Sequence, residues 1–235
     1  MRFGVGNGLR GLAAVAVLTG LTTGCGEAGK GSAGSEVSAG ASATAKAPAV
    51  KSPDAKPAQA VSGGSVGADG SACELPVTFD TAKAWKAKAV AAADQKGDTG
   101  NALADELADA LLHQGPVTMA CELDAKPAGN IGFLRVWTGK PGRADARTVL
   151  EQFVADEPGA GKARYSAFKV SGLTGAEVEF STYSEIMEES KKERALAVTT
   201  PDGPVVLHLG GLDTEEHEEM LPAFELAKRT LKQTA

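Results

Sequence analysis

Apolar and polar residues alternate along many short segments of the chain, which is the pattern of β-strands with one buried face. The first two such segments are 76–80 and 84–90. The next two, 117–123 and 131–138, flank a Lys-Pro-Ala-Gly-Asn turn and indicate a hairpin. The later segments with this pattern are 164–170, 176–183, 194–199 and 205–209. Most of these strands follow one another directly, so we expect them to pair antiparallel.

Three segments instead repeat their apolar residues at helical spacing. Leu103, Leu107 and Leu111 form one stripe and predict a helix over 100–113. A second helix is predicted over 144–156. A third begins at Asp213 or Thr214, ends near Gln233 and contains Pro222, where we expect a kink or a delayed start.

The order of these elements predicts an α+β fold with a largely antiparallel sheet covered by helices. The early strand pair with Trp85, the central hairpin and the closing strands with a long terminal helix resemble the PsbP-like fold of actinobacterial lipoproteins of the LpqN type. The resemblance covers about residues 74–233 and implies an α/β/α sandwich with a non-enzymatic binding or accessory role. A cystatin-like sheet wrapped on a helix is the alternative fold.

The first 25 residues have the pattern of an export signal. Arg2 and Arg10 precede an apolar run over 11–21, which is too short to cross a bilayer. The following Thr-Thr-Gly-Cys resembles the lipobox of bacterial lipoproteins, with Thr22 where leucine is usual. The resemblance implies a signal peptide over 1–24, diacylglycerol on Cys25, and a fatty acyl chain such as palmitate on the new amino terminus. An ordinary secretory signal and an uncleaved anchor are the alternatives.

Residues 25–72 are predicted to be the lipidated cysteine and a disordered linker. From Gly26 to Ala72 the chain is rich in Ala, Gly and Ser and contains no aromatic residue. We expect a single globular domain over 73–235.

Three cysteines occur in the whole chain. If Cys25 carries lipid, Cys73 and Cys121 remain as an even pair in an oxidising compartment, which predicts a disulfide between them. Two separate buried thiols are the alternative.

Charge argues against nucleic acid as a partner. The chain has 24 Lys and Arg against 30 Asp and Glu, a net charge of −6. An acidic chain without a basic stripe is a poor phosphate binder.

Candidate catalytic chemistry is incomplete. His217-Glu218-Glu219-Met220-Leu221 has leucine where a zinc-protease helix needs its second histidine, so we expect neither a metal nor catalytic residues there. The mixed charged run 185–194 is expected to be an exposed loop or hairpin tip. Trp85, Trp137 and Tyr183 are candidates for a ligand groove on the sheet, with core packing as the alternative.

These observations predict a lipoprotein anchored at the outer face of the cytoplasmic membrane, with a non-catalytic domain and no cofactor. Its expected partners are the membrane and a cell-wall component, a lipid or another exported protein. An envelope hydrolase whose site assembles only in the fold, and a structural envelope protein, are the alternatives.

Overall fold

Two antiparallel sheets form the framework of the computed structural model, which describes residues 59–90, 111–185 and 187–234. The larger sheet contains β3 (Lys86–Ala89), β4 (His113–Gln114), β5 (Val117–Asp124), β6 (Gly132–Gly139), β7 (Ala160–Val170), β8 (Leu173–Ser184), β9 (Glu189–Thr200) and β10 (Gly203–Gly211). Its order is β3-β5-β6-β10-β9-β8-β7, with β4 paired to β5. The smaller sheet has the order β1-β2-β11, from β1 (Ser62–Val66), β2 (Val77–Ala82) and β11 (Lys232–Gln233). These described residues belong to one compact unit, 51–235.

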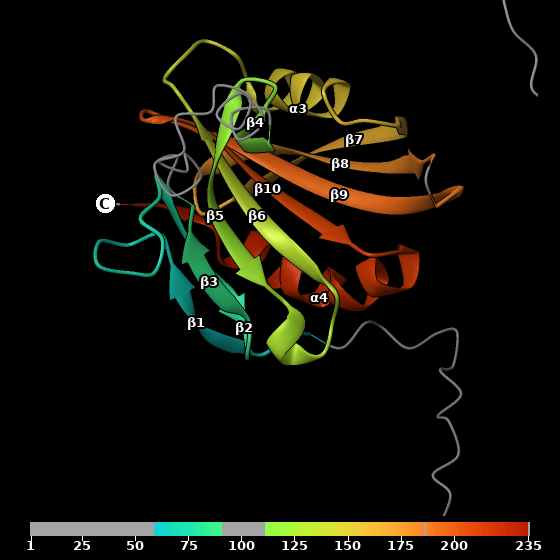
Figure 1. Cartoon of the computed structure of the whole chain (residues 1–235). Coiled ribbons are helices and arrows are strands. Elements are labelled where there is room, and N and C mark those ends of the chain that lie inside the picture. The colour runs from blue at the N-terminus through green and yellow to red at the C-terminus, as the bar shows by residue number, and fades with distance from the viewer. Residues whose placement is uncertain (1–58, 91–110, 186, 235) are drawn as a thin grey trace, which may run out of the picture. The chain divides into compact units, whose positions relative to one another are not determined.

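Two α-helices of the described residues lie on opposite faces of the larger sheet, as Figure 1 shows. Helix α3 (Ala146–Ala155) begins at Asp145, whose carboxylate accepts a hydrogen bond from the Thr148 backbone N–H at 2.8 Å. Helix α4 (Thr214–Thr230) begins after Asp213, which caps it in the same way. The helix starts at Thr214 and continues through Pro222, so the expected delayed start does not occur.

Alternation along the central strands sends side chains to two separate cores. On β10, Val205, Leu207 and Leu209 face α4 and the smaller sheet, whereas Val206 faces α3. We call these two sides the α4 face and the α3 face. β10 is buried on both because it lies at the centre of the sheet, between β6 and β9.

The predicted α+β class and the largely antiparallel sheet are confirmed. The cystatin-like alternative is wrong, because helices cover both faces of the larger sheet. The charged run 185–194 does contain a hairpin tip, but β9 begins within it at Glu189 and pairs with β8. The predicted helix over 100–113 falls largely on 91–110, outside the described residues, and His113 lies in β4.

The predicted disordered linker extends too far along the chain. Ser62–Val66 forms β1 and pairs with β2, so ordered structure begins before residue 73. Backbone hydrogen bonding needs no apolar side chains, and an added Cβ at Gly63 would lie 2.7 Å from the Lys83 Cα. The Gly and Ser content that suggested disorder therefore allows close strand pairing here.

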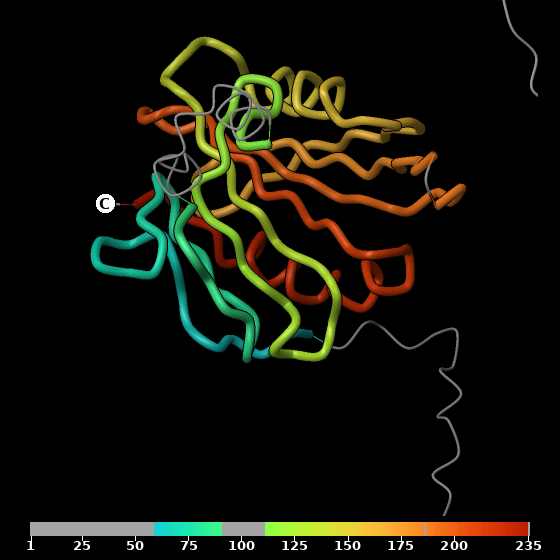
Figure 2. Tube along the Cα trace, in the orientation of Figure 1, coloured from blue at the N-terminus to red at the C-terminus, as the bar shows by residue number. Residues whose placement is uncertain are grey.

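The C-terminal end closes the smaller sheet beside the first described strands. Figure 2 shows the red end of the chain next to the teal segments, where β11 pairs with β2. The Thr234 N–H donates to the Pro76 carbonyl at 3.1 Å.

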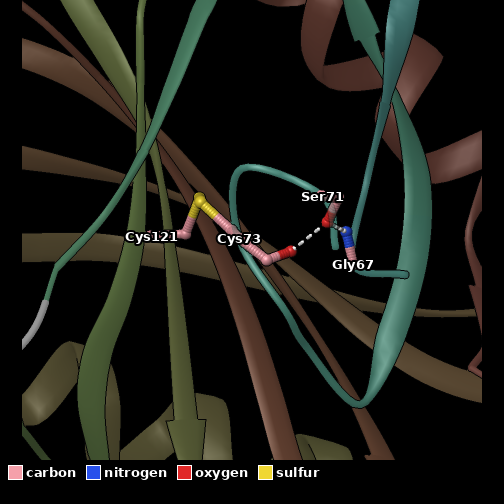
Figure 3. The surroundings of a disulfide bond; sticks show 4 residues. All are labelled: Gly67, Ser71, Cys73 and Cys121. Atoms are coloured by element: carbon pink, nitrogen blue, oxygen red, sulfur yellow. Dashed lines mark hydrogen bonds between the residues drawn. A yellow bond between two sulfur atoms is a disulfide. The ribbon is translucent and has the colours of Figure 1, made fainter. Parts of the chain in front are cut away.

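A disulfide joins the segment between β1 and β2 to β5. It links Cys73 and Cys121, whose Cα atoms are 5.9 Å apart and whose side chains are buried (Figure 3). The Ser71 hydroxyl donates to the Cys73 carbonyl at 2.7 Å and accepts from the Gly67 N–H at 3.1 Å. The pair expected from the sequence thus connects the two sheets.

Candidate functional site

The α3 face contains a cavity of about 670 Å³, which we call the His208 groove. Its polar lining residues include Lys88, Glu122, Arg135, Lys191, Glu193 and His208, and its apolar ones include Leu111, Ile131, Trp137 and Leu212. They come from β3, β5, β6, β9, β10 and the segments next to them. A volume of this size suits a small molecule.

A buried ion-pair cluster forms the centre of the groove. The His208 Nε2–H donates to the Glu193 carboxylate at 2.7 Å. The Lys191 ammonium lies 2.9 Å from the same carboxylate and also donates to the Gly211 carbonyl at 2.9 Å. Glu193 is 3% exposed, and a carboxylate buried this deeply requires such partners.

The surroundings keep Glu193 charged. Burial alone would raise the pKa of Glu193, but the hydrogen bond from His208 and the charges of His208 and Lys191 outweigh it and lower the pKa. An added Cβ at Gly210 would lie 3.3 Å from the carboxylate, so glycine leaves room beside it. The His208 ring packs against Phe153 and Phe180 at centroid distances of 5.3 and 5.9 Å, which holds its orientation.

Polar side chains cross the sheet in one row from β3 to β10. The strand register places Lys88 opposite Glu122, Glu122 opposite Arg135, and Arg135 opposite His208. The Arg135 Nε–H donates to Glu122 at 3.0 Å. Directly opposed side chains on neighbouring strands lie about 5 Å apart, so the row spans the floor of the groove.

Aliphatic side chains are exposed beside this polar floor. Leu111, Ile131 and Leu212 are 63%, 56% and 59% exposed, and all three line the groove. The other large hydrophobic side chains exposed among the described residues are Val61, Tyr183 and Met187, which do not line it. Burying one such side chain contributes about 1.5–3 kcal/mol, so this rim favours contact with an apolar group.

Trp137 adds an unused hydrogen-bond donor. Its side chain is 4% exposed and packs edge-on against Phe153 at a centroid distance of 5.6 Å. Its indole Nε1–H is buried without a hydrogen-bond partner within the part of the chain that the structure describes. A buried donor left unpaired costs about 1–3 kcal/mol of stability.

The predicted aromatic groove of Trp85, Trp137 and Tyr183 is wrong as a set. Trp85 belongs to the core of the α4 face and Trp137 to that of the α3 face, so the sheet separates them. Tyr183 is 48% exposed near the end of β8. Only Trp137 lines the His208 groove, and Cys25 lies outside the described residues.

The pairing of Glu193 with His208 is the feature that the sequence alone did not predict. Glu193 lies in the charged run 185–194, which was expected to be an exposed loop or hairpin tip. Alternation along the strand could have indicated its burial. Glu193 points to the same side of β9 as Ala195 and Ala197, which are buried on the α3 face. Only the register between β9 and β10 brings it to His208.

The described lining residues of the groove include no serine, threonine, tyrosine or cysteine, so they offer no hydroxyl or thiol nucleophile. Among residues 59–90, 111–185 and 187–234, no three His, Cys, Asp or Glu side chains are placed to hold a metal ion. In the same residues, no helix is long and apolar enough to cross a bilayer.

Comparison with known proteins gives a family and a structural likeness to solved proteins. No curated protein matches the chain. The solution structure of cyanobacterial PsbP (CyanoP) from Synechocystis sp. PCC 6803 is similar, with a TM-score of 0.44 and 11% sequence identity, over 67% of this chain and 86% of that one. That likeness is too weak to carry an argument about function. A family model described as "uncharacterised lipoprotein" matches residues 42–231, and the chain therefore belongs to this lipoprotein family.

Proposed function

We propose that this protein is an exported lipoprotein whose domain binds an amphiphilic small molecule in the His208 groove. In this proposal the signal peptide spans residues 1–24 and Cys25 carries the lipid that holds the protein at the outer face of the cytoplasmic membrane. Residues 26–58 serve as a spacer. Thirty-three residues span at most about 110 Å, which allows the domain to act at a distance from the anchor.

The observation that carries the binding role is the gathering of exposed aliphatic side chains at one cavity. Leu111, Ile131 and Leu212 line a cavity that is also lined by the polar side chains of the row from Lys88 to His208. An apolar group against the rim and a polar group against the row would match both features at once. An amphiphile, with an aliphatic chain and a polar end, has this combination.

A neutral apolar dye tests the binding role. We expect N-phenyl-1-naphthylamine to gain fluorescence with the full chain carrying Cys25→Ala, purified without detergent. Adding Ile131→Glu or Leu212→Glu places a charge at the rim and should weaken dye binding at least 10-fold. Val61→Glu is the matched control, because Val61 is 69% exposed and lies outside the groove. Dye binding that survives both rim substitutions, or that is equally lost in the control, contradicts the proposal.

The anchor has its own test. A single acyl chain binds a membrane only marginally, whereas several give a stable anchor. Cys25→Ala should therefore move the protein from the membrane pellet to the soluble fraction of cells. Unchanged sedimentation would contradict lipidation at Cys25.

A further inference from the structure

We propose that the ligand of the His208 groove has an anionic head, a carboxylate or a phosphate, held at the β3–β5–β6 end by Lys88 and Arg135. The inference rests on the proposed binding function and names the chemistry of the ligand. Three features carry it: the charges along the polar row, the donors that remain free there, and the distance to the aliphatic rim.

The charges of the polar row do not cancel. Within the row, Lys88 and Arg135 stand against Glu122, which leaves one positive charge when His208 is neutral. On β9, Lys191 stands against Glu193, so this pair adds no net charge. The chain as a whole has a net charge of −6, so the net charge of this row is opposite in sign to that of the whole chain. Glu157 also lines the groove, but it sits after α3, where the Gln114 side chain donates to it at 2.7 Å. With Glu157 counted, the lining has three positive and three negative side chains, so the excess positive charge belongs to the row on β3, β5 and β6 and not to the groove as a whole.

Free donors lie at that same end. Lys191 forms an ion pair with Glu193, and His208 donates a hydrogen bond to the same carboxylate. The Arg135 Nε–H donates to Glu122. The two terminal nitrogens of Arg135 make no hydrogen bond to the described residues, and neither does the Lys88 ammonium. A carboxylate or a phosphate can accept two hydrogen bonds from a guanidinium edge, and charge-assisted hydrogen bonds are about twice as strong as neutral ones. A cationic head would instead be repelled by both side chains.

The aliphatic rim lies at a suitable distance from these donors. Ile131 lies directly before β6 and four residues before Arg135, which corresponds to about 14 Å along an extended chain. Leu212 is beside it, since its N–H donates to the Ile131 carbonyl at 3.0 Å. An aliphatic chain that leaves a head at Arg135 thus reaches Ile131 and Leu212.

Competition against N-phenyl-1-naphthylamine tests the head group with four twelve-carbon amphiphiles below their micelle concentrations. Laurate and dodecyl phosphate are the anions, monolaurin is neutral, and dodecyltrimethylammonium is cationic. We expect at least one anion to displace the dye at a concentration at least 10-fold lower than the neutral and cationic compounds. Tighter competition by laurate assigns a carboxylate ligand, and tighter competition by dodecyl phosphate assigns a phosphate.

Substitution of Lys88 connects this preference to the groove. Lys88→Gln should reduce the preference for anions about 10-fold, while Lys88→Arg should retain it. Lys86→Gln is the matched control, because Lys86 lies on the same strand but does not line the groove. Equal competition by monolaurin and both anions, or an anion preference that Lys88→Gln leaves intact, overturns the inference while dye binding keeps the proposed function. Failure of the dye to bind overturns both.

Discussion

The two faces of the larger sheet are made by the same strands, yet they differ in chemistry. On the α4 face, β10 contributes Val205, Leu207 and Leu209, and none of these has any measurable exposure. On the α3 face, the same strand contributes Val206 and then His208, followed by Gly210. One face is thus apolar along the length of the strand, whereas the other changes from core to polar groove. The alternation of a single strand separates the residues that stabilise the fold from those placed to bind.

Two buried histidines differ in whether their imidazole ring has a polar partner. His208 on the α3 face has Glu193 as a partner at 2.7 Å. His217 in the first turns of α4 is 3% exposed, and its Nδ1 has no hydrogen-bond partner among the described residues. Burial lowers the pKa of His217 to about 4; the charges of Arg194 and His208 act in the same direction, and those of Glu193 and Glu218 oppose it. One histidine is built into a polar cluster, and the other is kept neutral by packing.

Removing the disulfide, which lies on the α4 face, should produce the largest loss of stability. Cys73 and Cys121 both belong to that core and lie 48 residues apart in sequence. Replacing both with alanine should lower the free energy of unfolding by about 4 kcal/mol, because the unfolded chain gains conformational freedom. Urea denaturation monitored by circular dichroism measures the change, with Cys25→Ala as the control. A loss below about 1 kcal/mol would mean that the two sheets do not depend on this connection.

Matched leucine truncations sharpen the contrast between the faces. Leu207→Ala on the α4 face should cost about 3 kcal/mol, because it leaves a cavity in a close-packed core. Leu212→Ala at the groove rim removes a side chain that is 59% exposed and should change stability by less than about 0.5 kcal/mol. Both values come from the same urea titrations. Similar costs at the two positions would show that the rim is part of the folded core.

Protonation of His217 in acid should lower the free energy of unfolding by less than the losses expected for the disulfide and for Leu207. The folded pKa of about 4 lies below the ordinary value of 6.5, so between these values the unfolded chain binds the extra proton. The contribution of neutral His217 to stability is therefore fully present above about pH 6.5 and is lost as the pH drops toward 4. The free energy of unfolding should fall by about 2 kcal/mol between pH 7 and pH 5.

His217→Gln removes the titrating group and should flatten this part of the stability profile. His113→Gln, at an exposed histidine, is the control. Urea midpoints at pH 5 and pH 7 give the comparison. If wild type and His217→Gln lose the same stability over this interval, His217 is not the buried acid-sensitive group.

Local patterns were sufficient for much of the fold. Alternating residues located β2, β3 and β5 to β10, whereas β4 and β11 lie in segments that were predicted as helix. The predicted cap at Asp213 matches the start of α4. They were insufficient for β1, whose Gly and Ser residues pair through the backbone. They also failed for the aromatic residues, since the sequence does not show that Trp85 and Trp137 pack on opposite faces.

The amino-acid sequence by itself determined the α+β class, the antiparallel arrangement and the cysteine pair. Strand and helix periodicity depends on residues near one another in sequence, and only two cysteines remain to pair once Cys25 is set aside. Only the tertiary structure decided that Lys88, Glu122, Arg135, His208 and Glu193 share one groove. These residues come from five strands, and their proximity depends on the order and register of the sheet. A shift of one residue in any of those pairings would turn a strand's side chains to the other face and disperse the groove.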